Sequence, residues 1–366
     1  MGFRLDTAVG LLRHDCPVTS LDPAAPPVRF GLVGYGFGGR YFHAPLLGAA
    51  PGIDLVGVVT SSAERRALVE QDSPGRATFG SLDELVAAGA EAVAISTPAA
   101  THSELTDQAL ELGLAVVCDK PFALDAAAAR RSTELARERG LALSPYQNRR
   151  WDSDFLTVRR LVADGVLGEV VRFESRFERL APNDGPGASG GGTLLDFGSH
   201  LVDQALVLLG PVESVYAEWR PRGNGLDDDV FVALTHIGGA RSHLWGSWSQ
   251  AAPGPRFRVT GTEAGYVNRT LMDIQEELLL AGETPASLGS AWGAEPAERW
   301  GRVHRGASAE TVPTEHGAWD TFYPAFARAV RGLGPLPVEP ADAVASMTVL
   351  DAARHSATEG VVVPLG

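Results

Sequence analysis

The stretch Gly34-Tyr35-Gly36-Phe37-Gly38-Gly39 decides the fold of the first half of the chain. It lies between an apolar run, residues 28–33, and a segment, residues 40–47, that can form a helix. A strand, a glycine loop and a helix in this order are what a dinucleotide site requires, because the free N–H groups and the dipole of the helix hold phosphate. We therefore predict a dinucleotide site at this loop.

The individual loop residues suit that site. Gly34 permits the tight turn, Gly36 lets the backbone approach a pyrophosphate, and Gly39 allows the helix to pack closely on the strand. Tyr35 and Phe37 lie between these glycines and are further candidate cofactor contacts. Because the chain has 42 glycines, the motif alone could also be an ordinary glycine-rich turn; its place between strand and helix favours the dinucleotide.

The end of the second predicted strand, residues 55–59, bears on which nucleotide binds. NAD sites usually place an acidic residue there for the ribose hydroxyl, whereas NADP sites replace it and add a cation for the 2′-phosphate. This chain has Thr60-Ser61-Ser62, followed by Arg65 and Arg66. These residues favour NADP(H) over NAD(H). The alternatives are that Glu64 reaches the ribose, or that the segment is only a helix cap followed by solvated arginines.

Composition limits the function. The 366 residues are 45% hydrophobic, enough for a large core, and 31 basic against 45 acidic side chains give a net charge of −14. This acidic balance argues against nucleic acid or an anionic membrane as partner. Cys16 and Cys118 are too few for a disulfide framework and favour a cytoplasmic protein. No apolar run approaches the roughly 20 residues of a membrane helix.

The order of the predicted elements indicates an α/β fold with two domains. From Val28, buried apolar strands alternate with helical patterns, which predicts a Rossmann domain over residues 28–147 preceded by an extension, residues 1–27. Residues 148–366 form the second domain, whose longer, alternating strands predict an open, mostly antiparallel sheet. These strands are expected at residues 170–177, 212–219, 230–237, 242–248 and 256–261. Residues 181–192 and 281–310 are expected to be long loops.

Asp196, His200 and Asp203 recur at helical spacing, i, i+4 and i+7, on an otherwise apolar segment. Buried polar groups without partners are costly, so such a stripe usually has a use. It can be the wet face of a surface helix, or a carboxylate and histidine metal site. The third interpretation is acid/base apparatus for a hydroxyl or carbonyl substrate, with His200 near its useful pKa.

Lys120 fits this third interpretation. It follows a buried strand at the carboxyl edge of the predicted parallel sheet, where ligands of open α/β sheets bind, and Pro121 stiffens the turn behind it. A lysine held there can hydrogen-bond a substrate oxygen and stabilise developing negative charge. Taken alone, Lys120 would be interpreted as a surface lysine after a strand.

Together these motifs resemble the Gfo/Idh/MocA oxidoreductases, from about Val28 to the C-terminus. Tyr41-Phe42-His43-Ala44-Pro45-Leu46 places the chain near the branch with NADP-dependent scyllo-inositol dehydrogenases and related sugar oxidoreductases. One departure is Asp119, where the family usually has glutamate before Lys-Pro. The other motifs that carry the resemblance are the glycine loop, Thr97-Pro98 with His102, Asp119-Lys120-Pro121, Asn148-Arg149-Arg150-Trp151, and Gly190-Gly191-Gly192 leading to Asp196, His200 and Asp203.

The resemblance implies a Rossmann domain, a second domain with an open sheet used for homo-oligomer contacts, in a dimer or tetramer, and a site at their junction. There Lys120, Asp196 and His200 would meet the substrate, with Thr97, Pro98, His102 and Lys120 beside the cofactor. The implied reaction is hydride transfer between nicotinamide and a ring hydroxyl or ketone of a sugar or cyclitol, with no metal. His200 is the expected acid/base and Lys120 the electrostatic aid, although their roles could be exchanged.

Further substrate contacts are expected from Arg149 and Tyr323, for which plain packing is an equal alternative. Two other functions remain open from the sequence. The fold could serve a non-catalytic NADP-binding regulator, which would not need acid/base residues. It could also serve a metal-dependent lyase or isomerase, which metal analysis would separate from a redox enzyme.

Overall fold

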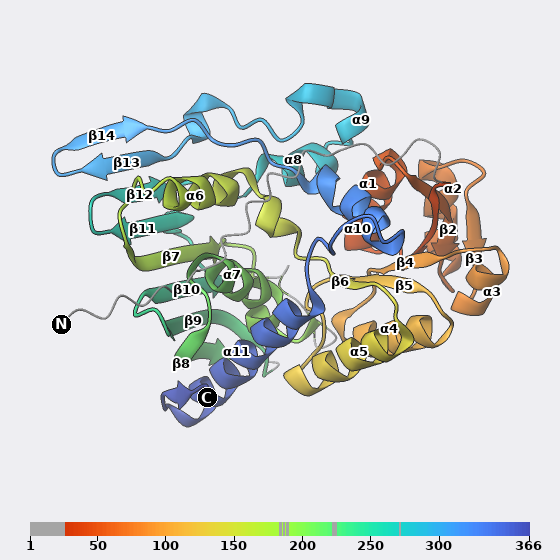
Figure 1. Ribbon diagram of the computed structural model, residues 1–366, viewed down its shortest axis with the longest axis horizontal. Helices are drawn as coiled ribbons and strands as arrows, with labels where there is room; N and C mark the ends of the chain where they lie inside the picture. Colours follow the sequence, from red (N-terminus) through yellow and green to blue (C-terminus); the bar gives the residue numbers. More distant parts are fainter. Residues whose placement is uncertain (1–25, 183–184, 186, 188–189, 222–224, 271) are drawn as a thin grey trace.

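Two β-sheets stand side by side in the computed structural model of this chain (Figure 1). The structure describes residues 26–366 except 183–184, 186, 188–189, 222–224 and 271. The predicted extension, residues 1–27, therefore lies outside the described residues apart from its last two. Within the described part of the chain, no helix is both long and apolar enough to cross a membrane.

The first sheet is parallel throughout, with strand order β3-β2-β1-β4-β5-β6. The order reverses between β1 and β4, and in open sheets of this kind ligands bind beyond the carboxyl ends of the strands at such a reversal. The strands are β1 (Val28–Val33), β2 (Ile53–Val59), β3 (Ala77–Phe79), β4 (Ala92–Ile95), β5 (Ala115–Cys118) and β6 (Leu143–Pro145). β4 and β5 are buried along their whole length, which explains their continuous apolar sequences.

Helices connect the strands of the first sheet, and local sequence signals set their ends. The side chains of Ser62, Ser81 and Asp125 each accept a backbone N–H at a helix start. Gly140 ends the last of these helices in the left-handed conformation. The helical segments are η1 (Gly39–His43), α1 (Ala44–Ala49), α2 (Ala63–Asp72), α3 (Leu82–Ala87), η2 (Ala99–Thr101), α4 (His102–Glu111) and α5 (Ala126–Arg139).

The second sheet has strand order β14-β13-β12-β11-β7-β10-β9-β8-β15 and is antiparallel except between β7 and β10. Buried and exposed residues alternate along β9, as the sequence pattern predicts for a sheet with one buried face. Its strands are β7 (Val170–Glu178), β8 (Val212–Pro221), β9 (Asp227–His236), β10 (Arg241–Ser247), β11 (Phe257–Gly261), β12 (Gly265–Asn268), β13 (Arg302–Arg305), β14 (Ser308–Thr311) and β15 (Val363–Pro364).

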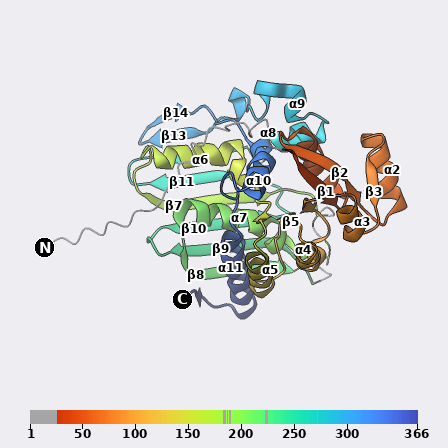
Figure 2. The same ribbon diagram turned by 45° about the vertical axis from the view of Figure 1, so that its right-hand side comes forward.

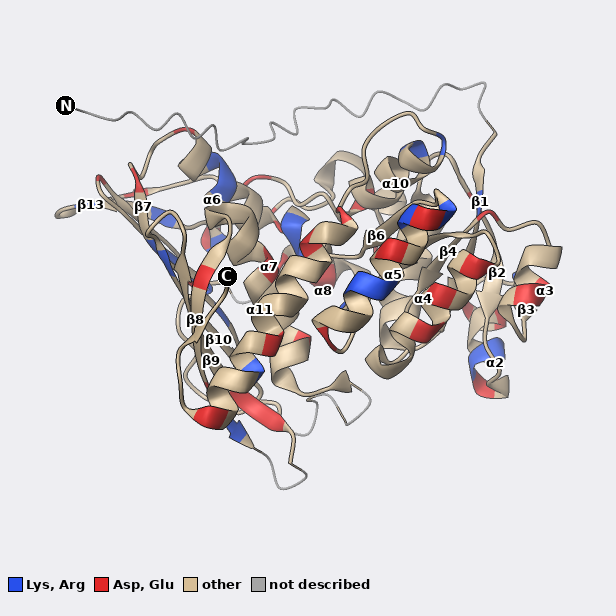
Figure 3. Cartoon of the chain, turned by 60° about the horizontal axis from the view of Figure 1, so that its bottom comes forward, with Lys and Arg blue, Asp and Glu red and all other residues tan. Residues whose placement is uncertain are grey.

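Helices α6, α7 and α11 lie on the face of the second sheet that looks toward the first sheet (Figures 2 and 3). Helix α7 packs on β7, β9 and β10, and α11 packs on β8 while also contacting α5 and α7, so it joins the two halves. In Figure 3 no described helix covers the other face of this sheet. The helical segments here are η3 (Asn148–Trp151), α6 (Ser153–Ala163), α7 (Thr193–Leu209), α8 (Ile274–Leu280), α9 (Pro285–Leu288), η5 (Gly289–Ala291), η6 (Ala297–Arg299), η7 (Trp319–Thr321), α10 (Phe322–Val330) and α11 (Pro340–Glu359).

Helix α10 returns to the first sheet although it follows almost the whole second sheet in the sequence. Its Tyr323 and Phe326 rings meet the Phe30 ring of β1 edge-on, with centroids 5.6 and 5.9 Å apart. All three side chains are at most 1% exposed. The core beneath β1 and β2 therefore contains side chains from both ends of the described chain.

The predicted fold class is confirmed: a Rossmann-type parallel sheet followed by an α/β part with a mostly antiparallel sheet. The segment 281–310 differs from the expected long loop, because it contains α9 and, at its end, most of the β13–β14 hairpin. Every residue of β14 is exposed. A strand that buries neither face leaves no alternation in its sequence, so the periodicity could not indicate it.

Candidate functional site

The glycine loop lies at the carboxyl end of β1, next to the end of β4. Gly34 has φ +93°, and a Cβ there would lie 2.3 Å from the Ser96 carbonyl oxygen. A Cβ on Gly39 would lie 2.3 Å from the Gly34 carbonyl oxygen. The fold itself thus requires glycine at both positions. At Gly36 a Cβ would meet no atom within 4 Å, so only a group approaching from outside gives a reason for glycine there. This surface fits a pyrophosphate.

The two aromatic residues of the loop point in different directions. The Tyr35 side chain is buried, and its hydroxyl donates to Asp72 at the end of α2, with an O–O distance of 3.0 Å. Phe37 is 59% exposed and packs against Tyr41 and Phe42. Tyr35 would therefore offer a nucleotide only its backbone, whereas the ring of Phe37 is accessible.

Beyond β2, the Thr60-Ser61-Ser62 segment runs into the first turn of α2. Ser62 caps this helix by accepting the Arg65 N–H at 3.2 Å, and Thr60 accepts the Ser62 N–H. The Arg66 guanidinium donates to the Thr60 carbonyl oxygen. The Arg65 side chain makes no hydrogen bond or ion pair to a described residue. The sequence pattern does not distinguish Arg65 from Arg66, but in the structure only the Arg66 side chain is bound to another described residue.

His102 begins α4 and joins two loops at the edge of the first sheet. Its Nδ1 lies 2.7 Å from the Pro121 carbonyl oxygen and its Nε2 lies 2.8 Å from that of Thr97. The side chain is buried, while Thr97 is partly exposed and Pro98 exposed. His102 would thus act on a bound nucleotide through the positions of these loops, because both of its nitrogens are already engaged.

Lys120 and Asp196 form the centre of the candidate site. Lys120 follows β5, Asp196 lies in the first turn of α7, and Lys120 Nζ lies 2.5 Å from Asp196 Oδ1. Their side chains are 25% and 20% exposed, so the pair is accessible to a ligand. The structure thus brings together two residues that are 76 positions apart and that the sequence predicts for one site.

His200 lies one turn further along α7 and is buried. Its ring meets the Phe177 ring edge-on, and its Nδ1 has no hydrogen-bond partner in the described residues. Burial lowers the pKa of His200 well below its ordinary value, and the positive charges of Lys120, Arg149 and Arg256 lower it further. The pKa of His200 thus lies below the useful range expected from the sequence, and its imidazole is neutral, with one nitrogen free of a proton.

The third member of the polar stripe has a different environment. Asp203 accepts two hydrogen bonds from the Arg150 guanidinium, at 2.6 and 2.8 Å, and its side chain is 2% exposed. This buried pair ties η3 to α7. The stripe is neither a wet helix face nor one of the groups whose ligand atoms lie close enough for a metal ion, as far as the chain is described.

Arg149 and Tyr323, the two further substrate candidates, are both engaged inside the protein. Arg149 forms ion pairs with Asp152 and Glu276, and its guanidinium lies over the Phe177 ring at 4.9 Å. The Tyr323 hydroxyl lies 2.5 Å from His43 Nδ1, and its side chain is buried. Arg149 therefore bears on the site by supporting Phe177, the ring against which His200 packs.

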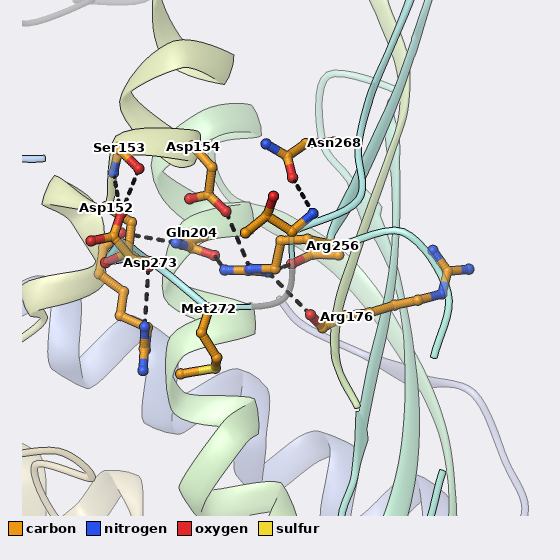
Figure 4. Close-up of polar contacts among 12 residues, drawn as sticks. Asp152, Ser153, Asp154, Arg176, Gln204, Arg256, Asn268, Met272 and Asp273 are labelled. Carbon is orange, nitrogen blue, oxygen red and sulfur yellow. Dashed lines mark hydrogen bonds and ion pairs between the residues drawn. The ribbon is translucent and has the colours of Figure 1, made fainter. Parts of the chain in front are cut away.

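A second group of polar residues, a buried acidic cluster, lies at the N-terminus of α6 and does not include Lys120 or Asp196 (Figure 4). Asp152, Asp154 and Asp273 place one carboxylate oxygen each within 4.8 Å of the others. Asp273 accepts the Ser153 N–H and hydroxyl at 2.6 and 2.7 Å, and Asp154 lies 3.6 Å from the Arg256 guanidinium. The N–H and hydroxyl groups of Ser153 and the guanidinium of Arg256 thus occupy positions around these carboxylates that a metal ion would need. We interpret the cluster as structural.

A pocket of about 200 Å³ lies next to the Phe177 ring, on which His200 packs. Glu178, Arg179 and Met272 line it together with Phe177. The Arg179 guanidinium stacks over the Trp248 ring at 4.8 Å, which holds it in one direction. The pocket therefore combines an apolar wall with charged groups.

A parallel sheet with this glycine loop is typical of dinucleotide-binding oxidoreductases, and the lysine, carboxylate and histidine near its edge are residue types used in acid–base chemistry. The family models make the class specific. Residues 28–147 match the oxidoreductase family, NAD-binding Rossmann fold, and residues 155–267 match the GFO/IDH/MocA C-terminal domain. The chain belongs to the Gfo/Idh/MocA oxidoreductases, as its sequence motifs predict.

Individual relatives cover nearly the whole chain. The uncharacterized oxidoreductase YdgJ of Escherichia coli is 36% identical over 352 residues, covering 90% of this chain and 98% of its own. The scyllo-inositol 2-dehydrogenase (NADP(+)) IolW of Bacillus subtilis is 31% identical over 344 residues, covering 91% and 94%. The crystal structure of an oxidoreductase from Bacillus cereus has a TM-score of 0.83 at 26% identity, covering 93% and 99%.

The family models and these relatives show that the protein is an NAD(P)-dependent oxidoreductase that acts on CH–OH groups of a small-molecule substrate. The sequence patterns do not assign a role to one group beside the site, His43, which lies 3.1 Å from the Asp119 carboxylate that precedes Lys120. The only signal was its place in the Tyr41-Phe42-His43 motif, because its partners are 76 and 280 positions away.

Proposed function

We propose that this protein catalyses reversible hydride transfer between NADP(H) and a carbon that carries a ring hydroxyl of a sugar or cyclitol. The observation that carries the proposal is the accessible Lys120–Asp196 pair, with the neutral His200 one helical turn away. A polyol could occupy the pocket beside Phe177, the ring on which His200 packs. The relative IolW is named a scyllo-inositol 2-dehydrogenase (NADP(+)), which describes oxidation of a cyclitol with NADP.

The side chains divide the work on the substrate oxygen. A nucleotide held at the glycine loop would supply the hydride chemistry at the substrate carbon, in either direction. The neutral His200 accepts the hydroxyl proton as the carbonyl forms, and it returns that proton on reduction. Lys120 donates a hydrogen bond to the same oxygen and stabilises its negative charge, while Asp196 holds the ammonium group in place.

The test is a screen of scyllo-inositol, myo-inositol, D-glucose and their keto forms with NADP(H) and NAD(H). Oxidation or reduction is followed by the absorbance of the reduced nicotinamide. We expect turnover with at least one cyclitol or sugar, and no dependence on added or chelated metal. A protein that binds NADPH tightly but turns over none of these compounds would instead fit a nucleotide-binding regulator.

NADP(H) as the preferred nucleotide is supported by Arg65. Its side chain is without a described partner beside Thr60-Ser61-Ser62, whereas Arg66 already donates to the Thr60 carbonyl. One lost charge-assisted contact costs about 1.5–3 kcal/mol, so Arg65→Ala should weaken NADPH binding about 10- to 150-fold. Arg66→Ala is the matched control and should change the affinity little. Fluorescence titration measures both; equal affinities for NADPH and NADH in the unmutated protein would contradict the assignment.

The open face of the second sheet supports a homo-oligomer, dimer or tetramer, because the part of that face described in the structure carries no helix. Sedimentation at several protein concentrations measures the subunit number. The cytoplasmic location inferred from the cysteine content also stays a prediction, which cell fractionation checks.

A further inference from the structure

The carboxylate of Asp119 is held on both of its oxygens. Oδ1 accepts the backbone N–H of Lys120 at 2.7 Å, and Oδ2 accepts the Ser96 hydroxyl at 2.9 Å. His43 Nε2 lies 3.1 Å from the same Oδ2. Because Asp119 directly precedes Lys120 and binds its N–H, the direction of this carboxylate bears on the direction of the lysine.

His43 reaches Asp119 from η1, the helical segment after the glycine loop. Its side chain is buried, and its Nδ1 lies 2.5 Å from the Tyr323 hydroxyl of α10. A carboxylate can only accept, and in the described residues the Tyr323 hydroxyl has no other partner. The consistent tautomer has Tyr323 donating to Nδ1 and the Nε2 hydrogen on the side of Asp119.

The contact between His43 and Asp119 is short in distance but not a well-aligned hydrogen bond, because Nε2 meets no acceptor in the required direction. We treat it as an electrostatic contact between a polar N–H and a carboxylate. The His43 ring is also fixed by packing, with its centroid 4.4 Å from that of Tyr146. Two tyrosines thus set the orientation of the imidazole.

Charge and burial agree with this direction of donation. Burial raises the pKa of Tyr323 well above its ordinary value, so the hydroxyl keeps its hydrogen. For Asp119, burial opposes ionisation, but His43, Lys120 and His102 outweigh it and lower the pKa. The chain of contacts therefore ends on an ionised carboxylate next to Lys120.

Gly38 of the glycine loop lies close to another side of this carboxylate. A Cβ on Gly38 would lie 2.7 Å from the Ser96 hydroxyl oxygen and 3.1 Å from Asp119 Oδ2. Asp119 is therefore flanked by the glycine loop, the end of β4 and His43, and only 17% of its side chain stays exposed. A side chain in such a setting has few alternative positions as long as each neighbour stays in place.

We propose that His43 is a positioning residue for Lys120: oriented by Tyr323, it fixes the Asp119 carboxylate and so directs the Lys120 ammonium group to Asp196 and the substrate oxygen. The inference rests on the proposed function, in which Lys120 acts on that oxygen. His43 itself touches neither substrate nor nucleotide in this assignment. It acts as the third group that orients a catalytic pair.

Two substitutions separate the functions of the two ring nitrogens. In His43→Asn, the amide oxygen replaces Nδ1 as the acceptor for Tyr323, and the group facing Asp119 is lost. In His43→Gln, the amide nitrogen reaches the position of Nε2. We expect kcat to fall about 10- to 100-fold in the Asn variant, with KM and NADPH affinity little changed, and to recover most of its value in the Gln variant.

His236→Asn is the matched control. His236 is also fully buried, but it lies in the second sheet and is hydrogen-bonded on both nitrogens, to the Gly210 carbonyl and the Ser242 hydroxyl. Both Asn variants should lose thermal stability, whereas only His43→Asn should lose kcat. In the Lys120→Ala background, His43→Asn should cost no further turnover, because both changes affect one group.

Crystal structures of the unmutated protein and the Asn variants give a reading that does not depend on turnover. We expect the Lys120–Asp196 contact to persist in His236→Asn and to open in His43→Asn. If the unmutated protein turns over no compound, the proposed function fails while this comparison still decides the role of His43. An intact Lys120–Asp196 contact in His43→Asn, or a kcat equal to that of the control, would overturn the inference.

Discussion

His200 illustrates how burial changes the role of a residue that the sequence singles out correctly. The position on α7 is predicted from the i, i+4 spacing with Asp196, which is a local property of the sequence. Its neutral state cannot be predicted from this spacing. That state depends on burial and on the positive charges of Lys120, Arg149 and Arg256, which come from three other segments. The same holds for Arg149, whose pairing with Glu276 joins residues 127 positions apart.

Substitutions at the candidate site should separate chemistry from nucleotide binding. Lys120→Ala, Asp196→Asn and His200→Ala should each lower turnover about 10²- to 10⁴-fold, because each removes proton transfer or stabilisation of charge on the substrate oxygen. Affinity for NADPH should stay within a few-fold. Steady-state kinetics and NADPH fluorescence are the measurements. Parallel loss of NADPH binding in His200→Ala would show that its assignment as acid/base is wrong.

His102 should carry a proton on both ring nitrogens at neutral pH. Both nitrogens face carbonyl oxygens, which can only accept. Burial lowers the pKa of His102, but Cys118, Asp119 and the Pro121 carbonyl outweigh it and raise the pKa to about 9. Nitrogen NMR should therefore show two ring N–H groups at pH 7.5.

The sign of the linked stability follows from that raised pKa. The stabilising contribution of His102 is complete below the unfolded pKa of about 6.5 and is lost as pH rises through about 9. Denaturant unfolding should show the free-energy difference between the unmutated protein and His102→Asn shrinking over that range. For His236, burial lowers the pKa, so its Asn variant should show no such loss above neutral pH. A neutral His102 at pH 7.5 would contradict the assignment.

At the level of elements, the N-terminus of α7 determines where Asp196 lies. Gly192 precedes the helix with φ +86°, and a Cβ there would lie 2.0 Å from Asp227 Oδ1. Asp227 in turn accepts the Leu194 N–H and so caps α7 from β9. The helix start is therefore fixed by a strand, not only by its own sequence.

Gly192→Ala should destabilise the protein by about 2 kcal/mol or more and also lower turnover, because backbone strain and the displaced cap both move the first turn of α7. Gly210→Ala at the other end of the same helix is the control. Gly210 has φ +76° but no atom within 4 Å of an added Cβ, so its variant should lose stability and keep kcat. Thermal unfolding and steady-state kinetics measure both; equal kcat values in the two variants would refute the link.

Which elements are predictable from sequence depends on where their signal lies. The glycine loop, the buried strands and α7 follow from spacing within a few residues. β15, a pair of residues, and the wholly exposed β14 have no such pattern. The docking of α10 on the first sheet depends on contacts with Phe30, almost 300 positions earlier, which no local pattern of residues 322–330 reveals.

For the molecule as a whole, the packing of α10 makes the first sheet depend on a late segment. Phe326→Ala should cost about 3–5 kcal/mol, because the ring is fully buried against Phe30. Amide hydrogens of β1 and β2 should then exchange faster. Phe257→Ala removes an equally buried ring from the second sheet and should leave exchange in β1 and β2 unchanged. Uniform acceleration over both sheets in both variants would mean that the two halves unfold as one unit.

The return of α10 also has a consequence for synthesis of the chain on the ribosome. Domains generally fold in the order in which they emerge, N-terminal first. Here β1 and β2 leave the ribosome early, but the helix that supplies Tyr323 and Phe326 to their core is made only after β14. During translation the nascent first sheet therefore exposes the Phe30 face until the strands of the second sheet, except β15, have been synthesised.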